Sequence, residues 1–168
     1  MSATIQSKAS ENGAGLERGP LLVSTFCLGN GVYALDTALV EEVVRLRRTT
    51  RVPHAPAYVL GVMNLRGKIV TVLDLGQILE LGKTTADEDS RLYIVRDGDG
   101  TTGLLVDRAA DVVELDGGAM EPLPASVREL QSRLFRGMAR AAGRLIAMLD
   151  AAAVLSLDLP KEGPGRRI

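Results

Sequence analysis

The fold of this chain is decided by the stretch Gly61-Val62-Met63-Asn64-Leu65-Arg66-Gly67-Lys68-Ile69-Val70-Thr71-Val72-Leu73-Asp74. Two glycines bracket an Asn-Leu-Arg segment, which predicts a turn. The run Lys68–Leu73 is dense in β-branched residues and predicts a buried strand. We expect Gly61 and Gly67 at places where the backbone needs a positive φ or a close approach that a side chain would forbid.

The same frame returns 76 positions later, as Gly137, Gly143 and Asp150. The basic residue after the second glycine, the apolar run and the closing Asp all recur, so the chain is internally duplicated. Because Asp74 and Asp150 each precede a predicted helix, we expect both to cap those helices rather than to act in acid–base chemistry.

Short strands at close spacing, turn glycines and only short helices predict a mainly β protein made of small barrels or sandwiches. The duplication predicts two such units, each built from one copy and packed on the other. The strands are expected at 21–28, 32–35, 42–48, 68–73, 91–95, 103–107 and 111–115, and the best helices at 75–81 and 151–157.

The two ends of the chain differ from its middle in composition. Residues 1–20 are rich in Ser, Gly and Ala and predict a flexible arm, while 158–168 predict a disordered tail. The folded part is expected at 21–157, with approximate halves at 21–90 and 91–157 and a possible exchange of strands between the barrels.

Composition excludes several classes of partner. A net charge of −1 gives no electrostatic case for binding nucleic acid or an anionic membrane, and 3% aromatic residues supply few stacking platforms. No apolar run reaches the length of a membrane span, and no signal-peptide core is present. We therefore expect a cytoplasmic protein whose single cysteine, Cys27, packs in an apolar run.

The sequence offers little for catalysis or for binding a cofactor. His54 is the only histidine, and no cysteine or second histidine lies at metal-ligand spacing from it. The segment Asp97-Gly98-Asp99-Gly100 resembles the start of a calcium loop but lacks the later ligands, so we interpret it as a turn. We expect no metal, no cofactor and no catalytic residue, with a small hydrolase using His54 as the rival interpretation.

Comparing the two copies draws attention to Arg66. The second copy has Ala142 at the same place, so the scaffold tolerates alanine there. Arg66 is then either a solvated turn charge or an oriented arginine, paired with a carboxylate, that presents a recognition surface.

Several blocks of sequence resemble the CheW family of bacterial chemotaxis coupling proteins, in the family's order from about Leu21 to Leu157. The most specific block is Val52–Gly67, with its prolines followed by Asn-Leu-Arg-Gly. The others are Tyr33–Asp36, Val40–Val43, Ile69–Leu75, Gly103–Asp107 and Asp111–Val113.

This resemblance implies two SH3-like five-stranded β-barrels around a shared apolar seam, and an adapter without catalysis. Its partners would be the cytoplasmic tips of chemoreceptors and the CheW-like regulatory domain of the histidine kinase CheA, in arrays under the inner membrane. CheW-like adapters also serve receptors that govern pilus motility. A structural barrel domain without a signalling role is a third interpretation.

The resemblance also implies which residues bind partners. Glu42 and Arg66 match positions linked to receptor and kinase coupling, and we hypothesise a salt bridge between them. A receptor groove is expected at the seam, where Val40, Gly61, Gly67 and Gly103 match positions implicated in binding. The glycine- and alanine-rich second copy, Gly137–Gly143, departs from the family pattern. The full set of expected partner-binding residues is Val40, Glu42, Gly61, Asn64, Arg66, Gly67, Gly103 and Val112.

Overall fold

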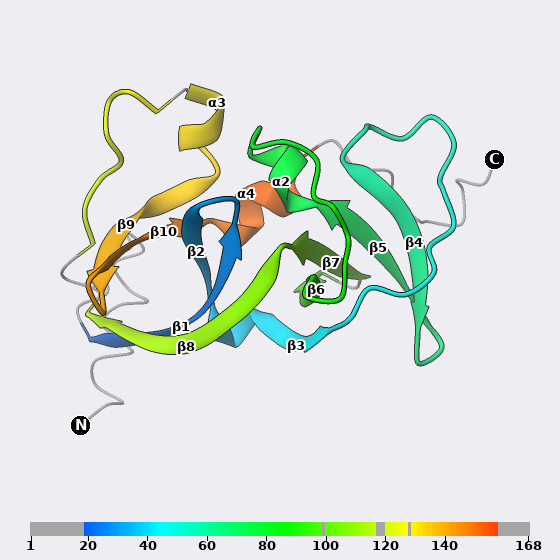
Figure 1. Cartoon of the computed structure of the whole chain (residues 1–168), viewed down its shortest axis with the longest axis horizontal. Helices are drawn as coiled ribbons and strands as arrows, with labels where there is room; N and C mark the ends of the chain where they lie inside the picture. Colours follow the sequence, from blue (N-terminus) through cyan, green and yellow to red (C-terminus); the bar gives the residue numbers. More distant parts are fainter. Residues whose placement is uncertain (1–18, 99, 117–119, 128, 158–168) are drawn as a thin grey trace.

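The computed structural model describes residues 19–98, 100–116, 120–127 and 129–157 (Figure 1). Residues 1–18 of the predicted arm and the whole predicted tail lie outside this part, whereas Pro20 already begins the first strand. The strands of the described residues are β1 Pro20–Leu28, β2 Gly31–Asp36, β3 Val40–Val44, β4 Val59–Leu65, β5 Lys68–Asp74, β6 Arg91–Asp97, β7 Gly100–Val106, β8 Arg108–Asp116, β9 Phe135–Ala141 and β10 Arg144–Leu149. The short helices between them are η1 Thr37–Leu39, α2 Leu75–Ile78, α3 Glu129–Ser132 and α4 Ala151–Leu155.

These strands form two five-stranded sheets, each curled into a small SH3-like barrel. Barrel A has the strand order β8-β1-β2-β10-β9, and barrel B has the order β3-β6-β7-β5-β4. The two barrels lie side by side in Figure 1. The mainly β fold with two barrels is confirmed.

The barrels are not each built from one copy of the repeat; strands are exchanged between them, as the sequence also allowed. Strand β2 pairs in parallel with β10, and β5 pairs in parallel with β7, so each barrel takes strands from both halves of the chain. Barrel B is continuous in sequence from Val40 to Val106, while barrel A combines β1 and β2 with β8, β9 and β10. A repeat shows which segments are equivalent, but it does not show which copy supplies the pairing partner, because strand pairing is non-local.

The duplication itself is present in the backbone geometry. Gly61 and Gly137 have φ angles of 143° and 152°, and Arg66 and Ala142 have φ angles of 54° and 53°. The isolated bridge from Thr50 to Val62 has its counterpart in the bridge from Glu121 to Met138. The two copies therefore share even their unusual backbone conformations.

The glycine-bracketed turn is shorter than expected. Asn64 and Leu65 continue strand β4, so only Arg66 and Gly67 form the turn into β5. Both have positive φ, as the two central residues of a type I′ hairpin turn require. Strand β3 also differs from the prediction, because it covers Val40–Val44 instead of 42–48.

Asp74 and Asp150 cap the helices that follow them, as predicted. The Asp74 carboxylate accepts hydrogen bonds from the backbone N–H groups of Gly76 and Gln77, and Asp150 accepts one from Ala153. Helix α2 ends at Ile78, earlier than the predicted residue 81, because Glu80 has a left-handed φ of 62° that interrupts the helical path.

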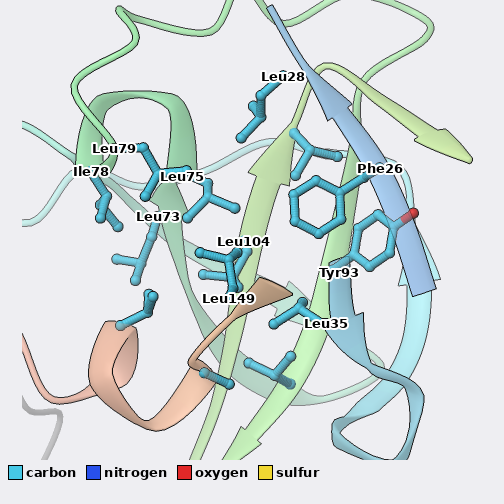
Figure 2. Packing of buried hydrophobic residues seen from close by; sticks show 14 of the residues in the cluster. Phe26, Leu28, Leu35, Leu73, Leu75, Ile78, Leu79, Tyr93, Leu104 and Leu149 are labelled. Atoms are coloured by element: carbon cyan, nitrogen blue, oxygen red, sulfur yellow. The ribbon is translucent and has the colours of Figure 1, made fainter. Parts of the chain in front are cut away.

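The largest core lies at the seam between the barrels. Phe26, Tyr93 and Leu104 are fully buried there and come from strands of both barrels (Figure 2). Two smaller clusters fill the barrel interiors, around Ala34 and Met148 in barrel A and around Val70 and Val72 in barrel B. The seam therefore joins the two barrels into one hydrophobic unit.

Candidate functional site

The clearest polar constellation on the surface is a two-pronged ion pair between Glu42 and Arg66. Arg66 Nη1 donates to Glu42 Oε2 at 2.6 Å, and Arg66 Nη2 donates to Oε1 at 2.7 Å. This fork-to-fork geometry fixes the plane of the guanidinium as well as its position. The hypothesised salt bridge is confirmed.

Two elements bring this pair together. Glu42 lies on β3, an edge strand of barrel B, and Arg66 lies at the tip of the β4–β5 hairpin on the opposite edge of the same sheet. Asn64 holds the tip in shape, because its Oδ1 accepts a hydrogen bond of 3.0 Å from the Gly67 N–H. We call Glu42, Asn64, Arg66 and Gly67 the charged corner.

The ion pair shifts both titrations. The hydrogen bond from Arg66, with the charges of Arg66 and Lys68, holds the pKa of the Glu42 carboxyl below its ordinary value. Glu42 in turn raises the pKa of Arg66. Both groups are therefore charged at neutral pH, although the Arg66 side chain keeps 68% of its surface exposed. An exposed, oriented arginine is available to an incoming partner.

A second ion pair lies on the other side of β3. Arg96 Nε donates to Glu41 Oε2 at 2.7 Å, and the side-chain exposures of 66% and 27% nearly equal the 68% and 30% of the first pair. Sequence reasoning missed this pair because Arg96 lies on β6, and only the register of β3 against β6 brings it near Glu41.

Exposed apolar side chains mark a second surface beside the seam. Val43 on β3 pairs with Tyr93, whose hydroxyl donates to the Thr25 carbonyl, and Thr25 donates to the Asp111 carbonyl of β8. Strands β3 and β8 therefore flank the same part of the seam. We call this surface the β3–β8 face; its apolar members are Leu22, Leu39, Val43 and Val112, with exposures of 54%, 44%, 41% and 55%.

The predicted site residues divide into three groups. Glu42, Asn64, Arg66 and Gly67 meet at the charged corner, and Val112 lies on the β3–β8 face.

The third group contains the remaining predicted residues. Val40 packs against the seam core. Gly61 and Gly103 are buried, and a Cβ on Gly103 would meet Ile94, Leu92 and Val70 inside barrel B. Of the four residues matched to the expected receptor groove, Gly61 and Gly103 are buried, Val40 is half-buried and Gly67 is exposed.

Leu22, Leu39 and Val43 were absent from the predicted site. All three have apolar side chains that sequence reasoning assigns to a core, and only their exposures in the structure show that they face outward. The sequence Glu41-Glu42-Val43-Val44 does not alternate between polar and apolar residues, so the alternating exposure along β3 is seen only in the structure.

His54 lies at an exposed turn with a φ of 63°. Among the described residues the His54 side chain forms no hydrogen bond or ion pair, and no three potential metal ligands gather. Within the same ranges, no helix combines the length and apolar character needed to cross a bilayer.

Comparison with known proteins gives one consistent result. The family model described as the CheW-like domain matches residues 23–158. The Bacillus subtilis protein described as chemotaxis protein CheW is 30% identical over 133 residues, covering 79% of this chain and 85% of that protein. FrzA from Myxococcus xanthus is 29% identical over 82 residues, covering 49% and 51%. The crystal structure of the scaffolding protein TtCheW from Thermoanaerobacter tengcongensis has a TM-score of 0.75 and 31% identity, covering 83% and 90% of the two chains.

Proposed function

The chain belongs to the CheW family of chemotaxis scaffold proteins, and we propose that it is a non-catalytic adapter that couples the cytoplasmic tips of chemoreceptors to the histidine kinase CheA. It would do so in the cytoplasm, within receptor arrays at the inner face of the membrane. The work of such an adapter is binding: it holds two partners at a fixed distance and orientation.

The observation that carries this proposal is the asymmetry of the charged corner. The two copies of the repeat share backbone geometry at Arg66 and Ala142, and Asp111 of β8 is equivalent to Glu42 of β3. Only the first copy has the arginine that completes an ion pair with this carboxylate. Folding does not require the pair, since the second copy forms the same turn with alanine. Glu42 and Arg66 are therefore assigned to recognition.

The remaining predicted residues support this recognition in different ways. Asn64 and Gly67 set the shape of the turn that carries Arg66. Val40, Gly61 and Gly103 act through the packing of barrel B, and Val112 supplies apolar contact area on the β3–β8 face. Two separate surfaces on one rigid body are what an adapter needs.

The test is reconstitution of receptor-coupled kinase activity with the full chain, CheA and receptor tips. Arg66→Ala is expected to weaken coupling by about tenfold, as for an arginine at the centre of a small interface. The thermal transition should hardly move, because the side chain is exposed. Normal coupling with a large loss of stability would assign Arg66 to the scaffold and contradict the proposal.

Arg96→Ala is the matched control. It removes an arginine of nearly equal exposure from an ion pair with the neighbouring glutamate on β3. Coupling should stay near the wild-type level. Equal losses in the two variants would mean that surface charge on barrel B matters without any special role for the corner.

A second candidate function is adapter of a chemosensory pathway other than flagellar chemotaxis, such as one that governs pilus motility. This candidate is supported by the match to a relative named FrzA, in addition to the relatives named CheW. Deleting the gene and scoring swimming and surface motility separately distinguishes the two. A defect in surface motility alone would select the second candidate.

A further inference from the structure

The β3–β8 face carries opposite charges at its two ends, and this pattern is a consequence of the duplication. Strands β3 and β8 are equivalent: Val43 corresponds to Val112, 69 residues later, and Val44 corresponds to Val113. The register supports this match, because each strand has a bulge at the same place, between Val40 and Glu42 in β3 and between Ala109 and Val112 in β8.

Charge reverses between these equivalent positions. Arg45 and Arg47 follow Val43 on the outward side of the chain, because Val44 and Leu46 between them pack into barrel B. The residues 69 positions later are Glu114 and Asp116, both exposed. Asp116 already interacts within the chain, so Glu114 is the carboxylate on which the contact of the acidic end depends. No described carboxylate forms an ion pair with Arg45 or Arg47.

The two charged ends lie on opposite sides of the apolar centre. In Figure 1, β3 and β8 run along the lower edge of the molecule and point away from each other. Arg45 and Arg47 follow the last residue of β3, and Glu114 and Asp116 are among the last three residues of β8, so the two charged groups are at the ends of oppositely directed strands. Val43 and Val112, both exposed, precede these charged residues in the chain. Leu22 pairs with Glu114, and Ser24, which pairs with Val112, is hydrogen-bonded to Thr37 close to Leu39.

We propose that this face binds a second copy of the same chain, as a two-fold symmetric dimer. A rotation of 180° about an axis in the plane of the face, across the line joining its ends, places the basic end of one copy over the acidic end of the other. Both ends are matched at once, and the apolar centres meet. The surface is thus complementary to itself.

The expected complex is weak and sensitive to salt. Only a few side chains on each copy take part, so the buried area falls below the roughly 1,200 Å² typical of stable complexes. Exposed charge pairs are screened strongly once the Debye length shortens at high ionic strength. Association is expected at protein concentrations on the order of 100 μM in low salt, with reversal in about 0.5 M salt.

Because Val43 and Val112 lie in the centre of the dimer contact, a receptor that uses the β3–β8 face would compete with the second copy. The proposal does not depend on that competition. Self-association is measured without receptor or kinase, so its failure would leave the adapter function untouched.

The test uses two charge-reversed variants of the full chain. The acidic variant combines Arg45→Glu with Arg47→Glu, and the basic variant combines Glu114→Lys with Asp116→Lys. In sedimentation equilibrium at low salt, wild type should approach twice its monomer mass of 17.9 kDa as concentration rises. Each variant alone should stay monomeric, because like charges then face each other.

Mixing the two variants is the decisive step. An acidic face and a basic face are complementary at both ends, so an equimolar mixture should form a heterodimer at least as tight as the wild-type dimer. Arg140→Glu with Arg144→Glu is the control, since it makes the same change in net charge at exposed positions of β9 and β10. That variant should dimerise like wild type.

Three results would overturn the proposal: wild type that stays monomeric at about 500 μM in low salt, a mixture that shows no heterodimer, or a control variant that is as impaired as the acidic one. Thermal transitions establish that each variant is folded. If a double variant does not fold, the single substitutions Arg45→Glu and Glu114→Lys provide the same mixing test.

Discussion

Gly61 and Gly67 lie in the same hairpin, yet each is glycine for a different physical reason. A Cβ on Gly61 would lie 2.3 Å from the carbonyl oxygen of Thr50, closer than any real contact. A Cβ on Gly67 would meet nothing within 4 Å, but its φ of 86° is one that side chains rarely adopt. Gly61 is required by space as well as by its φ of 143°, and Gly67 by conformation alone.

Gly61→Ala is expected to destabilise the protein severely, by about 3 kcal/mol or more, because two backbone segments must separate and the Thr50–Val62 bridge is lost. Denaturant unfolding measures the loss. Gly137→Ala is the matched variant in the second copy, where the added Cβ would lie 2.8 Å from the Glu121 carbonyl oxygen. A neutral result at Gly61 would mean that the loop carrying Thr50 moves away without cost.

Gly67→Ala should cost only about 1 kcal/mol, the price of a left-handed conformation for a residue with a Cβ. Gly67→Asn should cost less, since asparagine tolerates that conformation. Denaturant midpoints compare the variants. Equal stability of wild type and the alanine variant would remove the conformational explanation.

The Glu42 carboxyl should titrate below the ordinary range of a glutamate in an NMR titration. Since its folded-state pKa is depressed, any stability that the pair contributes is present above the unfolded-state pKa and is lost as the pH falls through the folded-state pKa. Arg66→Ala should raise the pKa of Glu42 toward its ordinary value. An unchanged titration would show that the two groups do not interact in solution.

At the scale of elements, the two capped helices differ in how much depends on their aspartates. Asp74 is fully buried and accepts hydrogen bonds from the N–H groups of Gly76, Gln77 and Thr84 and from the Gln77 side chain. Asp150 accepts one bond, from Ala153. Two equivalent aspartates in the repeat thus accept different numbers of hydrogen bonds.

Asp150→Ala should therefore cost about 1 kcal/mol, as for an ordinary helix cap. Asp74→Ala should cost about 3 kcal/mol, because it leaves several buried or half-buried donors without an acceptor. Unfolding free energies of the two variants give the comparison directly. If the two variants lose the same unfolding free energy, the extra hydrogen bonds of Asp74, including the one from Thr84, do not stabilise the protein.

The hairpins show what the sequence could predict and what it could not. Glycine spacing and β-branched runs predicted strands, positive φ at Gly67 and the caps at Asp74 and Asp150, because these depend on local chemistry. The pairing of β2 with β10, and the outward direction of Val43, depend on residues far apart in the chain. Local patterns do not encode those partners, so the sequence allowed an exchange of strands without identifying the partners, and it identified only Val112 on the β3–β8 face.

At the scale of the whole molecule, the exchange of strands makes the two halves of the sequence dependent on each other. A fragment of residues 19–90 has β3, β4 and β5 without β6 and β7, and it has β1 and β2 without their other partners. The seam core likewise joins Phe26 to Tyr93 and Leu104.

We therefore expect fragments 19–90 and 91–157 to be unfolded separately and to regain β structure when mixed. The full chain should unfold in one transition, since neither barrel can lose its seam contacts alone. Circular dichroism of the fragments, alone and together, measures this. Native-like structure in either fragment alone would contradict the dependence.

The interleaved order of strands also determines the order in which the two barrels can be completed during synthesis. All five strands of barrel B have left the ribosome once Val106 has emerged, while β1 and β2, made first, still lack the strands that complete barrel A. The β1–β2 hairpin cannot complete barrel A until β8, β9 and β10, which end at Leu149, have been synthesised. Until then its apolar side chains, such as Phe26, are exposed to solvent except where they contact barrel B. A nascent chain that stalls after Val106 and before Leu149 has emerged would carry a complete barrel B and an unpaired β1–β2 hairpin. During this interval the hairpin is most exposed to wrong pairing with the strands of a neighbouring chain.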